Sequence, residues 1–147
     1  MDNDSSKKIH FHFTFQQFTL RNRRELKYYI EYIFTREKHS LQELNFIFCN
    51  DREIKTLNKR FLGHDYATDI LTFNFSKKAA AIAADIFISQ ERVKWNAKEF
   101  HTSFKKEIHR VIFHGVLHLC GYKDKTSKEK LSMRSKEDYY LAKYFSS

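Results

Sequence analysis

The chain has 147 residues and a formal net charge of +9, a size that suits one domain with a buried core. Two cysteines cannot make a disulfide framework, and no apolar stretch resembles a secretory signal or a membrane span. We therefore expect a single cytoplasmic domain over residues 1–147. The positive charge favours an anionic partner such as RNA, and a basic but merely solvated surface is the alternative.

Hydrophobic periodicity predicts strands from alternating or continuous apolar runs, and helices from apolar residues three and four apart. In chain order it predicts a strand over 9–15, a helix to about 37, a strand over 44–49, a helix to about 63, strands over 70–75 and 82–89, a helix over 89–100, a helix with an apolar stripe over 104–119, and a helix to about 144. The linker between strands 70–75 and 82–89 is short enough for an antiparallel pair. This order predicts an α+β domain in which about five helices pack on a mixed four-stranded sheet.

Capping signals predict where several of these helices begin. Asn22 with Glu25, and Thr126 with Glu129, are similar to capping boxes for the first and last helices. The helix that starts near residue 50 is expected to use Asn50 or Asp51 as its N-cap.

The histidine-bearing helix carries the most informative motif. His114 and His118 are four residues apart, so on a helix they share one face, at the edge of the apolar stripe. Gly121 ends the helix, and Asp124 follows where the chain can turn back. Because three protein ligands and an open position are typical of catalytic zinc, we predict one metal ion held by His114, His118 and Asp124. A chance histidine pair, and an ordinary turn residue at position 124, are the alternatives.

Two other residues of this helix concern the same site. Glu107 falls on the histidine face, where it is placed to accept a hydrogen bond from an imidazole N–H; an exposed glutamate paired with a lysine is the alternative. Gly115 stands where zinc proteases of the H-E-x-x-H type carry their general base. The glycine argues against that class and is expected to open space beside the metal.

The segment from His114 to Tyr122 (HGVLHLCGY) resembles the H-G-x-L-H-L-x-G-Y-D-H signature of the YbeY family of bacterial endoribonucleases. Residues 57–61 and 68–73 resemble the family's L-N-x-x-F/Y segment and T-D-V-L-S-F strand, and residues 84–89 its G-D-I-x-I-S strand. The resemblance implies an α+β fold with a mixed sheet. It also implies a metal-dependent hydrolase that cleaves RNA during ribosomal RNA maturation, with ribosomal RNA or the ribosome as partner and neither a membrane nor an organic cofactor.

The chain departs from the family pattern at two places. The family's third histidine is replaced by Asp124, which keeps a ligand for zinc but makes the set anionic. Two histidines and one carboxylate also match non-haem iron sites, and zinc is preferred because the resemblance is to hydrolases. Leu62 stands where the family usually has an arginine, which weakens the expected catalysis more than metal binding.

The sequence leaves the general base open. Asp69 and Asp85 are the candidates, because they lie on strands that the family places near the site. The candidate RNA-binding residues are Lys59, Arg60, Lys123 and Lys125. The alternative functions are a ribosome-assembly factor with little nuclease activity and a zinc hydrolase of a substrate other than RNA.

Overall fold

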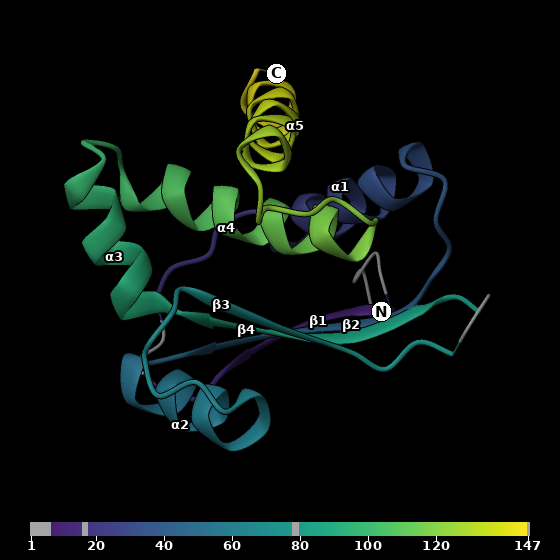
Figure 1. The fold of residues 1–147 in the computed structure, drawn as a ribbon. Coiled ribbons are helices and arrows are strands. Elements are labelled where there is room, and N and C mark those ends of the chain that lie inside the picture. Colours follow the sequence, from purple (N-terminus) through teal and green to yellow (C-terminus); the bar gives the residue numbers. More distant parts are fainter. Residues whose placement is uncertain (1–6, 16–17, 78–79, 147) are drawn as a thin grey trace.

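The computed structural model of the chain describes residues 7–15, 18–77 and 80–146 (Figure 1). Its elements are β1 (Ile9–Phe13), α1 (Arg23–Arg36), β2 (Leu41–Cys49), α2 (Asp51–Leu62), β3 (Ile70–Asn74), β4 (Ile82–Ser89), α3 (Gln90–Glu99), α4 (Phe104–Leu119) and α5 (Ser127–Phe145). The predicted α+β class, with a mixed four-stranded sheet and five helices, is confirmed. None of the helices in the described ranges is both long and apolar enough to cross a membrane.

The sheet has the strand order β1-β2-β4-β3. β1, β2 and β4 are parallel neighbours, and the antiparallel β3 pairs with β4 as the short linker predicts. The parallel step from β1 to β2 requires a crossover connection, which α1 supplies.

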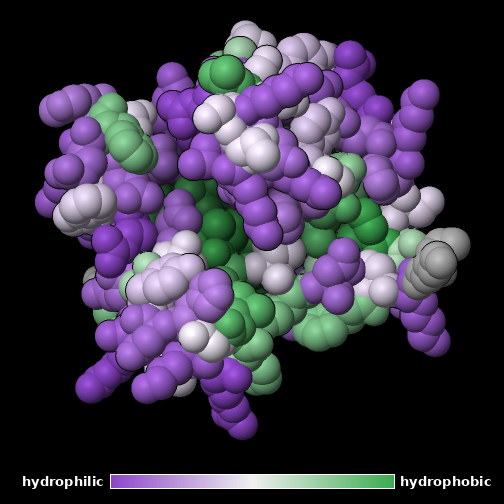
Figure 2. Space-filling view, viewed as in Figure 1, coloured by the Kyte–Doolittle hydropathy of each residue, from purple (hydrophilic) through white to green (hydrophobic). Residues whose placement is uncertain are grey.

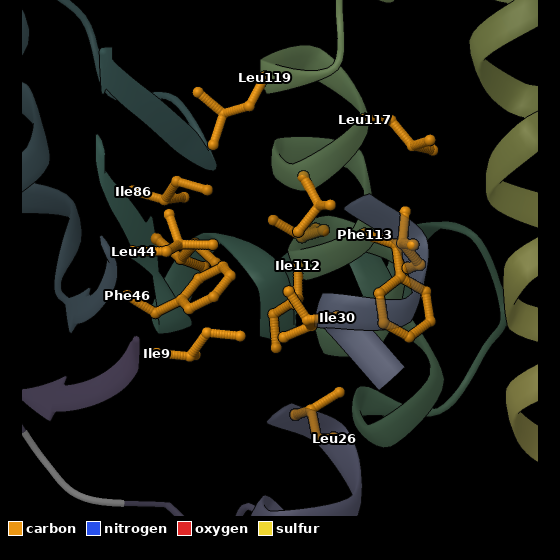
Figure 3. Packing of buried hydrophobic residues seen from close by; sticks show 14 of the residues in the cluster. Ile9, Leu26, Ile30, Leu44, Phe46, Ile86, Ile112, Phe113, Leu117 and Leu119 are labelled. Carbon is orange, nitrogen blue, oxygen red and sulfur yellow. The ribbon is translucent and has the colours of Figure 1, made fainter. Parts of the chain in front are cut away.

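The two faces of the sheet are covered differently. α2 lies on one face, whereas α1, α3 and α4 lie on the other, and α5 packs outside α4 (Figure 1). Since successive strand side chains point to opposite faces, only alternate residues meet the α4 layer. Figure 3 shows strand residues meeting helix residues in this layer, among them Ile9, Leu44, Phe46, Ile86, Ile30 and Ile112.

Gly115 is the position at which α4 lies directly against side chains of β3 and β4. A Cβ atom at this position would lie 2.9 Å from Ile86 Cδ1 and 3.0 Å from Ile70 Cδ1. The glycine therefore lets the helix pack against β3 and β4. The expectation that it opens space beside a metal is wrong, because two isoleucine side chains fill that space.

The capping predictions have different outcomes. Asn50 and Thr126 each make a complete capping box, with Glu53 and Glu129 respectively. The box predicted at Asn22 is wrong: this residue has φ 56°, in the left-handed region, and its side chain makes no cap hydrogen bond. A side-chain cap normally needs extended backbone at that position, so the left-handed backbone here withdraws the Asn22 side chain from the helix amides.

Candidate active site

A pocket of about 490 Å³ lies where α3, α4 and α5 meet the start of β3. Figure 2 shows a hollow on this side of the molecule, with hydrophobic residues at its floor and hydrophilic residues around it. Eight charged or titratable residues line the pocket: Asp69, Glu107, Arg110, His114, Asp124, Lys130, Arg134 and Glu137. The fold thus brings together residues from β3, α4, α5 and the loop between the two helices.

His114 is held between two carboxylates. Its Nδ1 donates to Glu137 Oε2 at 2.6 Å, and its Nε2 lies 3.3 Å from Asp124 Oδ2. Burial disfavours the charged ring, but the hydrogen bond and charge of Glu137, with Asp124 and Asp69 nearby, outweigh burial and raise the pKa of His114. The imidazole therefore has a fixed orientation in an acidic setting.

His118 is exposed and is oriented by a backbone group. Its Nδ1 donates to the carbonyl oxygen of Tyr122 at 3.2 Å. Gly121 has φ 104°, a conformation that favours glycine, and the resulting turn brings this carbonyl back over the helix end. Tyr122 is itself anchored, because its hydroxyl donates to Glu37 Oε1 at 2.8 Å.

Glu137 is a site residue that the sequence analysis missed. Its side chain is 6% exposed and accepts from Arg110 Nη1 at 3.0 Å as well as from His114. The acceptor role expected of Glu107 belongs to Glu137 in the structure. One signal existed: Glu137 shares helical spacing with Met133, Tyr140 and Leu141, all buried, and a carboxylate in an apolar stripe needs a partner.

Two further carboxyl groups of the pocket are shifted toward their neutral forms. Burial raises the pKa of Asp69, although the charge of His114 opposes this shift. Burial also raises the pKa of Glu107, with Arg110 opposing and Asp69 adding to the shift. Glu107 is only 5% exposed, which excludes the alternative of an exposed surface glutamate.

Several candidate residues lie away from this pocket. Asp85 follows Ala84, which packs in the α4 layer, so it points to the opposite face, where it accepts from Asn45 Nδ2 at 3.1 Å. Lys59 and Arg60 belong to α2 on that same side, as does Leu62, which is 51% exposed. Lys123 and Lys125 flank Asp124 and are exposed.

The cations that line the pocket come from other positions. They are Arg110, Lys130 and Arg134. Arg110 is committed to Glu137 and to Asp138. Within the described ranges Lys130 and Arg134 form no ion pair, so they remain available to an anionic ligand.

The structure brings the three predicted metal ligands only partly together. In the part of the chain that the structure describes, no three His, Cys, Asp or Glu side chains already surround a point that could hold an ion. Two of the three predicted ligands, His114 and Asp124, are nevertheless in contact at 3.3 Å. Both histidines use Nδ1 for a hydrogen bond, so in the neutral form of each ring Nε2 carries the lone pair that can coordinate an ion; Nε2 of His114 already faces Asp124.

Together, the mixed sheet and the histidine-carboxylate pocket define an α+β protein with a site of the hydrolytic type. Residues 6–145 match the family model described as Endoribonuclease YbeY. The chain is 52% identical to Endoribonuclease YbeY of Cytophaga hutchinsonii over 126 residues, covering 86% of this chain and 88% of that protein. It is 41% identical to Endoribonuclease YbeY of Flavobacterium johnsoniae, covering 87% of this chain and 91% of that protein.

The fold has a solved counterpart as well. The solution structure of TM1509 from Thermotoga maritima superposes with a TM-score of 0.64 at 29% identity, covering 95% of this chain and 89% of the other. With these matches, the chain belongs to the YbeY family.

Proposed function

We propose that the protein is a metal-dependent endoribonuclease that acts in ribosomal RNA processing in the cytoplasm. One observation supports this most: His114, between Glu137 and Asp124, lines the same pocket as the partly buried carboxyl of Asp69 and as Lys130 and Arg134 of α5, which form no ion pair among the described residues. Family membership supplies the expected substrate, since the relatives carry the name endoribonuclease.

We propose zinc as the ion, held by His114, His118 and Asp124. Two ligands about 2.1 Å from a tetrahedral ion lie about 3.4 Å apart, which agrees with the 3.3 Å between His114 Nε2 and Asp124 Oδ2. His118 is exposed and would have to close on the other two. When bound, the ion would stabilise charge that develops on the phosphate and would lower the pKa of an attacking water.

Two carboxyl groups of the protein, those of Asp69 and Glu107, would carry out proton transfer during cleavage. Asp69 lines the pocket, and burial raises its pKa, so its carboxylate is a stronger base than an ordinary aspartate. It would take the proton from the attacking hydroxyl, either water or the ribose 2′-OH. Burial, with the charge of Asp69 adding to it, raises the pKa of Glu107, so Glu107 would keep a proton and would give it to the oxygen that leaves the phosphorus.

Lys130 and Arg134 would bind the phosphate. Both line the pocket, and a cation near the phosphorus stabilises the charge that develops there. They enter from α5, on the opposite side of the sheet from Leu62. They would therefore replace the function, but not the position, of the family arginine that this chain lacks.

Cleavage of a structured RNA by wild-type, His114→Ala and Asp124→Ala proteins, stripped of metal and reloaded with single metals, tests this function. We expect cleavage to need metal and to fall below detection in both variants, with zinc affinity by calorimetry also reduced. Cleavage that survives both substitutions would indicate a contaminating nuclease and contradict the proposal. Ribosomal RNA binding without any cleavage in the wild type would instead support an assembly factor.

A further inference from the structure

A second cavity lies on the other flank of α3, and neither the metal site nor the carboxyl groups use it. It encloses about 730 Å³ and is lined by α3, by the start of α4 and by the segment that follows β1. We call it the α3 groove; its residues are Phe15, Phe18, Thr19, Gln90, Glu91, Lys94, Trp95, Lys98 and Phe104.

The apolar part of the α3 groove is entirely aromatic. Trp95 is 53% exposed and Phe15 is 44% exposed. Phe18 is half-buried and held edge-on by Phe104 at 5.2 Å and by Phe48 at 5.0 Å between ring centroids. Large rings that remain in water on a rigid support are suited to stacking against flat ligands.

The charged part of the groove favours an anionic ligand. Lys94 and Lys98 are one helical turn apart on α3 and form no ion pair within the described ranges. Glu91 is the acidic residue of the lining, and its carboxylate accepts from the amide of Asp51 at 2.9 Å. That carboxylate is directed to the amino terminus of α2 and, among the described residues, forms an ion pair with neither Lys94 nor Lys98, so both ammonium groups can contact an anionic ligand.

From these observations we infer that the α3 groove binds single-stranded RNA, with bases stacked on Trp95 and its phenylalanine neighbours and phosphates on Lys94 and Lys98. This inference depends on the proposed function. α3 also forms a wall of the catalytic pocket through Asn96 and Phe100, so one strand can cross the helix and occupy both cavities. The groove would thus hold the part of the substrate that flanks the cleaved bond.

Trp95 provides a direct probe, because it is the only tryptophan in the sequence. In the His114→Ala background, single-stranded 12-nucleotide RNA should quench its fluorescence, whereas blunt RNA duplex of equal length should not. By fluorescence anisotropy of an end-labelled 12-mer, which does not depend on Trp95, Trp95→Ala and the Lys94→Gln/Lys98→Gln double variant should each weaken binding about tenfold. The Lys55→Gln/Lys106→Gln variant, with the same charge loss elsewhere, should weaken it less than threefold.

The groove and the proposed function fail in distinguishable ways. If wild-type protein with metal cleaves RNA but the groove variants bind the 12-mer as tightly as wild type, the groove inference is overturned, and a protein partner becomes its expected occupant. If wild-type protein neither binds nor cleaves any RNA, the proposed function itself is wrong. Circular dichroism of each variant separates lost binding from lost folding.

Discussion

Both faces of the sheet carry residues that the sequence singles out as candidates, but only one face brings them together around a pocket. The α4 face gathers Asp69, His114 and Asp124 around one pocket, with Glu137 behind the histidine. The α2 face receives Asp85, Lys59, Arg60 and Leu62, which lie on the other side of the strands. Resemblance to a family motif therefore indicates that a residue is a candidate, but it does not show on which face of the sheet the residue lies. Strand alternation, and the face on which each helix packs, decide which residues share a site.

A matched pair of aspartates gives the strongest test of this contrast. Asp69→Asn should lower the cleavage rate by about 10²- to 10⁴-fold, because the amide cannot take a proton. Asp85→Asn removes the same charge on the opposite face and should change the rate less than threefold. Single-turnover kinetics with saturating metal measure both. Equal losses in the two variants would show that the sheet does not separate them functionally.

The cations of the two faces can be compared in the same way. Lys130→Ala/Arg134→Ala should lower kcat/KM by about 10- to 100-fold, because both side chains line the pocket and form no ion pair with a described acidic residue. Lys59→Ala/Arg60→Ala should have a small effect on cleavage, since Lys59 pairs weakly with Asp65 and Arg60 lies over Phe61. A larger loss in Lys59→Ala/Arg60→Ala would mean that the phosphate binds on the α2 face of the sheet, and it would contradict the proposed site.

On the α4 face, a comparison of Glu137 with Asp138 distinguishes the orientation of His114 by a carboxylate from the effect of a nearby negative charge. Glu137→Gln should weaken zinc binding about 10- to 100-fold, because the amide no longer fixes His114 as a carboxylate does. Asp138→Asn is the control: Asp138 also accepts from Arg110, at 2.8 Å, but its side chain is 58% exposed and does not contact His114. Isothermal titration calorimetry with zinc compares them. Equal affinities in the two variants would reduce Glu137 to a structural role.

The sequence predicted the fold better than the site, for a physical reason. Periodicity is local, so strands such as β4 (Ile82–Ser89) and helices such as α5 (Ser127–Phe145) follow from their own residues. The contact between His114 and Glu137 joins residues 23 positions apart on two helices, and only tertiary packing creates it. The sheet face on which Asp85 lies depends on which residues of β4 contact α4, and this cannot be read from the strand alone. The left-handed backbone at Asn22 is likewise not indicated by the residues around it.

Glycines on the two faces should differ in what they disturb. Gly115→Ala should cost about 1–3 kcal/mol in unfolding free energy and lower cleavage as well, because the new methyl pushes α4 away from Ile86. Gly63, at φ 73° with open space around it, ends α2, so Gly63→Ala should cost about 1 kcal/mol through backbone strain alone. Urea unfolding and cleavage assays together separate these effects, and an unchanged free energy of unfolding in Gly115→Ala would contradict the tight packing.

The smallest expected effect concerns His109, a buried histidine on the far side of α4 from the sheet. Its ring stacks on Tyr144 with 5.4 Å between centroids, and its Nδ1 donates to the carbonyl of Lys105 at 2.7 Å. Burial lowers the pKa of His109, although this hydrogen bond opposes the shift. The unfolded chain, with an ordinary histidine pKa of about 6.5, therefore binds the proton more readily than the native state.

By linkage, the contribution of His109 to stability is complete above that pH and is lost as the pH falls below it. His109→Phe should flatten this acid-side loss, so the difference in urea midpoint between pH 7.5 and pH 5 should be smaller than in wild type. His39→Phe, at an exposed histidine, is the control for replacing a histidine by phenylalanine. Parallel curves for wild type and His109→Phe would mean that His109 binds its proton equally well in the native and unfolded states, which would contradict the lowered pKa.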